Sequence, residues 1–595
     1  MLDLEKLLKI PGVDSEYGFD ISPDGKTVAF SWNASGQWEI YTLPLDLSSP
    51  PHCISEGLGG KFAPYFSPDG TQLAYCLDLD GGENFDIWLY DILTAKHLNL
   101  TPDTEYAIQP EISWSPDGSQ LAFISDASGK FEAYRLFLSD KSVHRLAELP
   151  FPVRNVKWSP AADKVAMVTY ASGQDYFTYL VSVESGNIYP ISDENGPICA
   201  KDVTWSPDGS RLTFASNLNE SYQIGIIDCT TKAIAWLTAD DNENEHPYWS
   251  PNGDWITFVA QAGPTTELAI LSVEGRSLSY YSIAQGIHYR PMFTPDNCAI
   301  VLVFDSPCHP PDLWCFSLRE KTFKQLTNSL PEEFQKNNFT RPEHIWYSGK
   351  DGEKIPAMLY RPNREHRELA AVVYIHGGPN WLSQFTWEPL IQHMVSRGWV
   401  VLAPNYRGST GYGKAWQLAN LFDLGGVDTS DVAAGVDYLI ENHIAKPDLI
   451  AVTGRSHGGY LTMTCLTQYP ELWAGGSAVV PFLNWFTSHE NSRPDLQHWD
   501  LENFGDPVIN KERYYERSPY FFLDRIKAPV QLICGANDPR CPASESIQAY
   551  EVMQKLGNPC DFVLYPDEGH AFLKIKNVVD AKKRQVEFLA SLLEK

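Results

Sequence analysis

The sequence predicts an array of repeated short strands in its first half and an α/β domain with a largely parallel sheet in its second half. Three observations support this. A short phrase recurs seven times before residue 300, apolar runs alternate with helix-like stretches after residue 330, and a serine framed by glycines lies in the second region. A chain of 595 residues also exceeds the size of one ordinary core. We therefore expect two domains, over residues 1–330 and 331–595.

The recurring phrase is Ser/Thr-Pro, usually followed by Asp/Asn-Gly and then by a short apolar run. Proline, aspartate and glycine favour a tight turn, and the apolar run that follows is typical of a strand. A period of about 45 residues with several strands per unit indicates a propeller blade, which unrelated hairpins of a β-sandwich would not explain. Seven copies predict a seven-bladed β-propeller with a short N-terminal extension. The prolines of the copies are Pro23, Pro68, Pro116, Pro160, Pro207, Pro251 and Pro295.

The second half has the pattern of an α/β domain. Residues 369–375 and 399–403 are apolar runs that predict buried strands. Residues 431–440 and 578–593 have the spacing of amphipathic helices. Strands that alternate with helices predict a parallel sheet covered by helices.

The clearest chemical signal is Gly454–Gly458, with the sequence Gly-Arg-Ser-His-Gly. A strand-like run precedes it and a helix start follows it, which is the context of the nucleophile elbow of α/β-hydrolases. In such an elbow the serine hydroxyl stands above the sheet on a tight turn. We therefore expect Ser456 to be a nucleophile. The alternative is a glycine-rich turn with an incidental serine.

A serine nucleophile needs a base, and the base needs an orienting acid. In this fold the chain order is serine, acid, histidine, and each follows a strand end. Asp538 and His570 follow two strand-like runs downstream of Ser456. We predict a Ser456–Asp538–His570 triad. Asp567 is a rival acid, and His457 is a rival base whose side chain the elbow should direct away from the serine hydroxyl.

The oxyanion of the tetrahedral intermediate needs two N–H donors. One is expected to be the backbone N–H of His457, directly after the nucleophile. The other should come from the loop after the strand that ends at Ile375, where we favour Gly377 over Gly378. No cluster of ligand residues predicts a metal site, and no phosphate-binding loop is present, so we expect neither a metal nor a cofactor.

A seven-bladed propeller followed by these motifs resembles the prolyl oligopeptidase family of serine peptidases over essentially the whole chain. Several segments look most like the acylaminoacyl-peptidase branch of that family. His376 stands where the prolyl and dipeptidyl branches usually have tyrosine, and His457 also replaces a usual tyrosine. The segments that carry the resemblance are 376–379, 405–413, 425–428 and 537–540.

The resemblance implies a serine peptidase that cleaves short or N-acylated peptides through an acyl-enzyme, with the propeller limiting access. It also implies that Arg540 holds a substrate oxygen, for which a surface ion pair is the alternative. Trp485 lies in the segment that forms the side pocket in this family, for which core packing is the alternative. Phe482, Phe486 and Trp499 share that segment.

Composition narrows the partners. The chain has 75 acidic and 46 basic side chains and a net charge of −29, which argues against nucleic acid or an anionic membrane as the main partner. Eleven cysteines occur without a CxxC pair, and the N-terminus lacks the features of a signal peptide. We expect a cytoplasmic protein whose partner is a peptide substrate. The family resemblance adds the expectation of a homo-oligomer.

Two other functions remain open from the sequence. The same triad would serve an esterase or an acyl-transferring biosynthetic hydrolase, because serine acyl chemistry cleaves esters and amides alike. A propeller interaction scaffold with an inactive hydrolase is the third hypothesis, and the complete set of Ser456, Asp538 and His570 argues against it.

Overall fold

The computed structural model describes residues 1–102, 104–335, 339–363 and 368–594. Its contacts divide the chain into two compact units. One unit comprises residues 11–79 and 83–335, and the other comprises residues 1–10, 80–82 and 336–595.

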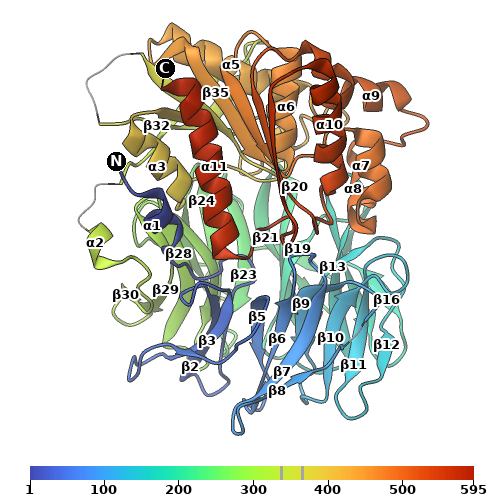
Figure 1. Cartoon of the computed structure of the whole chain (residues 1–595). Helices are drawn as coiled ribbons and strands as arrows, with labels where there is room; N and C mark the ends of the chain where they lie inside the picture. Colours follow the sequence, from blue (N-terminus) through green and yellow to red (C-terminus); the bar gives the residue numbers. More distant parts are fainter. Residues whose placement is uncertain (103, 336–338, 364–367, 595) are drawn as a thin grey trace. The chain divides into compact units, whose positions relative to one another are not determined.

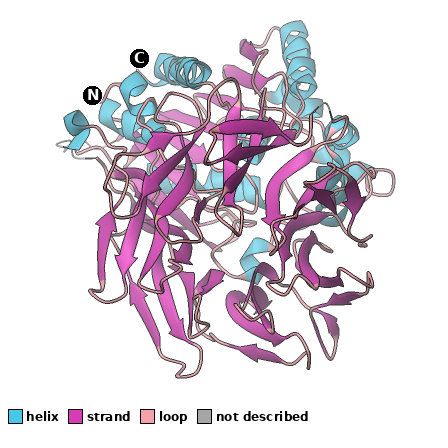
Figure 2. Ribbon diagram, turned by 90° about the horizontal axis from the view of Figure 1, so that it is seen from below, coloured by secondary structure: helices cyan, strands magenta, loops and turns pink. Residues whose placement is uncertain are grey.

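The first unit is a β-propeller, as predicted. Its described residues form seven four-stranded antiparallel sheets and one two-stranded hairpin (Figure 2, strands in magenta). The blades are β1–β4 (Phe19–Ile21, Thr27–Trp32, Glu39–Pro44, His52–Cys53), β5–β8 (Gly60–Phe66, Gln72–Asp78, Phe85–Asp91, Lys96–Asn99), β9–β12 (Ile108–Trp114, Gln120–Ser125, Glu132–Phe137, Val143–Arg145), β13–β16 (Val153–Trp158, Lys164–Tyr170, Tyr176–Ser182, Ile188–Pro190), β19–β22 (Lys201–Trp205, Arg211–Asn219, Ser221–Asp228, Ile234–Trp236), β23–β26 (Glu243–Trp249, Trp255–Ala262, Thr265–Ser272, Leu278–Tyr281) and β27–β30 (Ile287–Phe293, Ala299–Ser306, His309–Ser317, Thr322–Gln325). The hairpin is β17–β18 (Ser192–Asp193, Gly196–Pro197).

The repeated phrase forms the turn between the first and second strands of each blade. In the third blade, the Ser115 hydroxyl donates to Asp117 Oδ1 over 2.6 Å and accepts the Gln120 backbone N–H over 3.0 Å. Gly118 closes the turn with a φ of +71°. Glycine adopts this left-handed conformation without a steric penalty, which explains why the phrase ends in glycine.

The second unit is built on an eight-stranded sheet in the order β31-β32-β34-β33-β35-β36-β37-β38. The first two pairings, β31–β32 and β32–β34, are antiparallel, and all the others are parallel. This is the α/β-hydrolase architecture that the sequence predicted. The strands are β31 (Glu343–Ser348), β32 (Lys354–Tyr360), β33 (Leu369–Ile375), β34 (Val400–Pro404), β35 (Ala445–Arg455), β36 (Gly475–Val479), β37 (Val530–Gly535) and β38 (Cys560–Tyr565).

Helices cover both faces of this sheet, because alternate strand residues point to opposite faces. Val373 and Leu402 pack with Leu461 of α6 on one face. The neighbouring residues Val372 and Val401 pack with residues of α3 and α11 on the other face. Figure 1 shows α3 and α11 beside the sheet. The helices are α2 (Glu332–Gln335, in the first unit), α3 (Pro389–Arg397), α4 (Lys414–Gln417), α5 (Val427–Glu441), α6 (His457–Gln468), α7 (Trp485–Asn491), α8 (Pro494–Asn503), α9 (Lys511–Glu516), the 3₁₀ helix Pro519–Arg525, α10 (Ala543–Leu556) and α11 (Ile575–Leu593).

The N-terminal residues belong to the second unit, although we expected them to extend the propeller. Helix α1 (Leu4–Leu8) contacts α3 and α11. Leu4 joins the apolar cluster under these helices, and the Leu2 N–H donates to Ser396 Oγ over 2.9 Å. The physical reason is that the short helix buries its leucines against the sheet-covering helices. Among the described residues, no helix combines the length and apolar character that a membrane span requires.

Candidate active site

Ser456 lies in a strained turn between β35 and α6. Its backbone has φ +59° and ψ −125°, a conformation that L-residues rarely adopt and that costs on the order of 1–3 kcal/mol. The Ser456 N–H donates to the Val479 carbonyl over 2.9 Å, which fixes the turn to β36. The side chain is half-buried at the carboxyl end of the parallel strands. This is the geometry of the predicted nucleophile elbow.

The two glycines of the motif are required by close backbone contacts. A Cβ on Gly454 would lie 2.4 Å from the Gly458 carbonyl oxygen. A Cβ on Gly458 would lie 2.3 Å from the Ile375 carbonyl oxygen. Both distances are far below any real carbon–oxygen contact, so neither position admits a side chain. The sequence signal therefore has a direct steric cause at this turn.

Asp538 and His570 are hydrogen-bonded to each other. Asp538 Oδ2 lies 2.8 Å from His570 Nδ1, and both side chains are buried. Asp538 Oδ1 accepts the backbone N–H groups of Arg540 and Cys541, each over 2.9 Å. One carboxylate oxygen is thus held by the loop and the other orients the imidazole, as a base requires.

The electrostatics favour a neutral imidazole. Burial lowers the pKa of His570 below its ordinary value of 6.5, and Asp538 opposes this shift. The guanidinium groups of Arg455 and Arg540 add to the lowering. The Arg455 guanidinium also donates to the His570 carbonyl oxygen, which ties the histidine loop to the end of β35. A neutral imidazole is the form that can accept a proton from serine.

Ser456 lies near Cys541, and the Cys541 backbone N–H donates to Asp538 Oδ1 over 2.9 Å. No hydrogen bond joins the Ser456 hydroxyl to His570 in the described part of the chain. Catalytic hydrogen bonds are often long in free enzymes and tighten when substrate binds. The structure thus brings Asp538 and His570 together and places Ser456 beside the same loop.

The two rivals named from the sequence have other partners. Asp567 bonds Lys574 Nζ over 2.7 Å and Asn577, and its side chain is 42 % exposed. His457 is 2 % exposed, with its Nε2 3.3 Å from Asp428 Oδ2. Asp567 therefore does not hold His570, and the His457 imidazole points into the protein interior.

The loop after β33 passes directly against the elbow. A Cβ on Gly377 would lie 3.4 Å from the Ser456 Cβ and 3.1 Å from the Arg455 carbonyl oxygen. A side chain at this position would press on the elbow, so glycine lets the loop backbone lie close to the nucleophile. Gly378, the alternative donor, has a φ of +113°. These contacts support Gly377 and the N–H of His457 as neighbours of the reacting carbonyl.

His376 holds the Gly377 peptide in place, a role that sequence reasoning missed. Its Nδ1 lies 2.7 Å from the Gly377 carbonyl oxygen and its Nε2 lies 2.9 Å from Ser409 Oγ. The ring stacks on Tyr406 with centroids 4.4 Å apart. Burial lowers the pKa of His376 to about 3, so the ring is neutral. Tyr406 and Ser409 both lie in the segment 405–413, which resembles the family. That resemblance was the sequence signal that could have indicated the role of His376.

The two predicted substrate residues differ in their surroundings. Arg540 is half-buried, and its charge acts on His570 beside it. Trp485 is 2 % exposed, donates to the Tyr460 hydroxyl over 3.1 Å and stacks on Phe504 at 4.1 Å. This burial favours the packing role of Trp485 over a direct substrate contact. Phe482 is partly exposed and stacks on Tyr460 at 4.5 Å.

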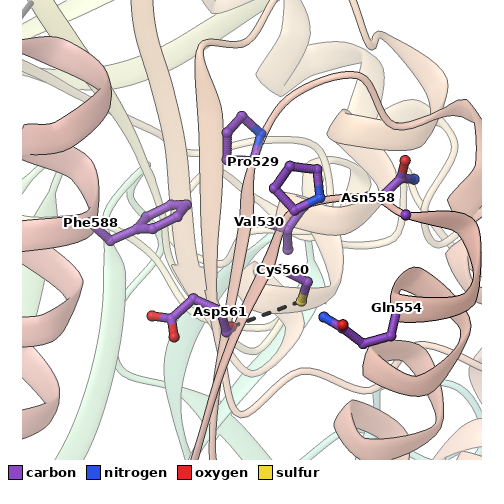
Figure 3. Close-up of a pocket in the computed structure, with 9 residues that line it drawn as sticks. Pro529, Val530, Gln554, Asn558, Cys560, Asp561 and Phe588 are labelled. Carbon is purple, nitrogen blue, oxygen red and sulfur yellow. Dashed lines mark hydrogen bonds between the residues drawn. The ribbon is translucent and has the colours of Figure 1, made fainter.

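A cavity of about 540 Å³ lies at the amino ends of strands β37 and β38 (Figure 3). Its lining includes Val530 and Cys560, the first residues of β37 and β38, together with Phe588 of α11. Asp538 and His570 follow the opposite ends of these strands, so the cavity is separate from the candidate active site. In the residues that the structure describes, no group of three or more His, Cys, Asp or Glu side chains is placed to hold a metal ion.

Comparisons with known proteins agree with this geometry. Residues 383–595 match the family model "Prolyl oligopeptidase family", and residues 20–150 and 146–336 match the model "TolB beta propeller domain". The uncharacterized peptidase YuxL of Bacillus subtilis is 24 % identical over 626 residues, covering 85 % of this chain and 93 % of YuxL.

A second relative is the acylamino-acid-releasing enzyme of Rattus norvegicus, which is 28 % identical over 257 residues. The alignment covers 42 % of this chain and 34 % of the rat enzyme, so this chain spans about a third of that enzyme's length. A puromycin-hydrolyzing peptidase of Mycobacterium tuberculosis has the same fold, with a TM-score of 0.86, 17 % identity and coverage of 100 % of this chain and 96 % of that one. Residues 383–595 therefore form a catalytic domain of the prolyl oligopeptidase family of serine peptidases, and a β-propeller precedes this domain in the chain.

Proposed function

We propose that this chain hydrolyses short or N-acylated peptides through an acyl-enzyme on Ser456. The observation that carries the proposal is the buried Asp538–His570 hydrogen bond of 2.8 Å beside a strained elbow serine. Such a pair has the chemistry of a general base with its orienting acid. The similarity to acylamino-acid-releasing enzymes supports the N-acylated substrate class.

In this mechanism the Ser456 hydroxyl attacks the scissile carbonyl while His570 Nε2 takes its proton. Asp538 keeps the proton of His570 on Nδ1 and stabilises the imidazolium that forms. The N–H groups of His457 and Gly377 stabilise the oxyanion. His570 then protonates the leaving amine, and a water molecule repeats the sequence on the acyl-enzyme.

The remaining expectations are part of the proposal. Arg540 would hold a substrate oxygen through its guanidinium, which suits carbonyl and carboxylate groups. The propeller would limit entry to small peptides. A cytoplasmic location and a homo-oligomeric state stay predictions from the sequence.

The substrate class can be tested by comparing three chromogenic substrates of one amino acid: the N-acetylated anilide, the free aminoacyl anilide and the N-acetylated nitrophenyl ester. We expect a larger kcat/KM for the acetylated anilide than for the free aminoacyl anilide. Ser456→Ala is the control for hydrolysis by a contaminant. Ester turnover without any anilide cleavage would contradict the peptidase and favour the esterase hypothesis.

A further inference from the structure

The first strands of most propeller blades share an irregularity in their pairing at an equivalent position. Most successive first strands contact each other, and most pair with their second strand through a register shift. The residue four positions before the Ser/Thr of each turn lies at this shift. It has a positive φ in five blades, between +46° and +82°. In blade order these residues are Gly18, Ala63, Glu111, Asn155, Asp202, His246 and Arg290.

Members of this set on neighbouring blades contact one another, which places them around the axis. Asn155 Nδ2 donates to Glu111 Oε2 over 2.8 Å. His246 Nδ1 lies 3.6 Å from Asp202 Oδ2. A Cβ on Gly18 would lie 3.1 Å from Arg290 Cδ. Five of the seven positions therefore carry polar or charged side chains, and these lie on five consecutive blades.

Two cationic residues directly precede members of this set: Arg154 before Asn155 on the fourth blade and Lys201 before Asp202 on the fifth. The Arg154 guanidinium carbon lies 4.9 Å from the centre of the Tyr176 ring and 6.0 Å from that of Tyr170. Lys201 Nζ lies 4.1 Å from the centre of the Tyr222 ring and 6.0 Å from that of Tyr176. The two positive charges thus share one tyrosine ring. Aromatic faces hold cations in place without neutralising them.

The two cations differ in their carboxylate partners. Lys201 forms an ion pair with Glu245 and lies 3.9 Å from Asp202 Oδ2. Arg154 makes no hydrogen bond or ion pair with the residues that the structure describes, and it is exposed to solvent. Glu111 and Asp202 attract it only at longer range. Its guanidinium therefore lies against two rings, and none of the described residues accepts a hydrogen bond from its N–H donors.

We propose that Arg154, with Lys201 beside it, binds a carboxylate group of a peptide ligand in the propeller. A guanidinium presents two parallel N–H donors that match the two oxygens of a carboxylate. The neighbouring rings of Tyr170 and Tyr176 restrain the guanidinium in advance, which lowers the entropy lost on binding. The carboxylate can come from the chain end of a peptide or from an acidic side chain. The site lies within the propeller and does not depend on the proposed hydrolysis.

The test measures peptide binding by calorimetry to the full-length chain with Ser456→Ala, which prevents turnover. The probes are N-acetyl-trialanine with a free carboxylate, the same peptide as its amide, and N-acetyl-Ala-Glu-Ala-amide. A charge-assisted bidentate contact should make at least one acid bind roughly tenfold more tightly than the neutral amide. Preference for the first or the third probe over the neutral amide identifies the chain end or the side chain as the source.

Three variants in the same background assign the effect. Arg154→Met should remove the preference, and Arg154→Lys should keep part of it because the charge remains. Arg211→Met is the matched control. The Arg211 guanidinium carbon also lies over an aromatic ring, 4.9 Å from the centre of Trp249, but Arg211 does not contact the tyrosine rings that hold Arg154. Equal binding of acids and amide, or a full preference in Arg154→Met, would overturn the proposal.

Discussion

The glycines of the propeller turns and those of the nucleophile elbow are needed for different physical reasons within this one chain. Gly118 in a blade turn has φ +71°, and a Cβ there would come no closer than 3.7 Å to another atom. Gly458 in the elbow would bring a Cβ within 2.3 Å of a backbone oxygen. The blade turn needs a backbone conformation, whereas the elbow needs empty space. A change in one blade turn is therefore expected to stay local, whereas a change at the elbow should displace β33 and the catalytic serine together.

The largest loss of activity is expected from a change at the catalytic acid, because Asp538 is a single residue of the site and not part of a repeated turn. Asp538→Asn should lower kcat by about 10³- to 10⁴-fold, since the amide no longer stabilises the imidazolium or the required tautomer. Asp567→Asn is the matched control and should change kcat less than about twofold, because that carboxylate bonds Lys574 instead. Equal losses in the two variants would show that the acid is assigned wrongly.

Two alanine substitutions test whether the blade glycine and the elbow glycine have these different roles. Gly458→Ala should reduce kcat/KM on the order of 100-fold or more, because misplacing the reacting groups by about 1 Å has that cost. Gly118→Ala should leave kcat/KM unchanged and lower the free energy of unfolding by about 1 kcal/mol, the usual cost of a left-handed alanine. Steady-state kinetics and thermal unfolding of both variants measure this. Normal kinetics in Gly458→Ala would refute the steric account of the elbow.

The pH dependence of kcat/KM should follow the ionisation of His570. Burial lowers the pKa of this imidazole below its ordinary value of 6.5. The base must be neutral, so kcat/KM should be retained above the lowered pKa and lost as the pH falls through it. The acid limb is therefore expected below pH 6.5. Because Asp538 raises the pKa, residual activity of Asp538→Asn should have its limb at still lower pH. A limb above 6.5 would indicate that the imidazole is less buried than described.

The smallest effect is expected for the hydroxyl of a blade turn. Ser115→Ala removes the hydrogen bonds to Asp117 and to the Gln120 N–H. A loss of about 1 kcal/mol in the free energy of unfolding is expected, with unchanged kinetics. Chemical denaturation of the variant measures it. A change in kcat/KM larger than twofold would mean that the blades are not as independent of the site as their turns suggest.

The repeat and the elbow could be predicted from the sequence because each depends on local geometry. The Ser-Pro-Asp-Gly phrase encodes a complete turn, and Gly454 and Gly458 encode the close backbone contacts around Ser456. Asp538 was predictable from chain order, because the parallel strands bring their carboxyl ends to one edge. The structure places Asp538 against His570 as that reasoning requires.

Features that depend on distant partners could not be predicted in this way. The leucines of α1 indicate a buried helix face but not which unit it packs against. The aromatic character of Trp485 is equally compatible with a pocket wall and with the core, and only its 2 % exposure separates the two. The tether from His376 to Gly377 required the side chain's orientation, which no spacing in the sequence encodes.

The most direct test of the account is the site and rate of reaction with a fluorophosphonate, read by mass spectrometry of the digested protein. We expect a single adduct on Ser456, no adduct in Ser456→Ala, and labelling at least about 10³-fold slower when His570 is replaced by glutamine. An adduct on another serine, or an unchanged labelling rate without His570, would contradict the assignment of Ser456 as a nucleophile activated by His570.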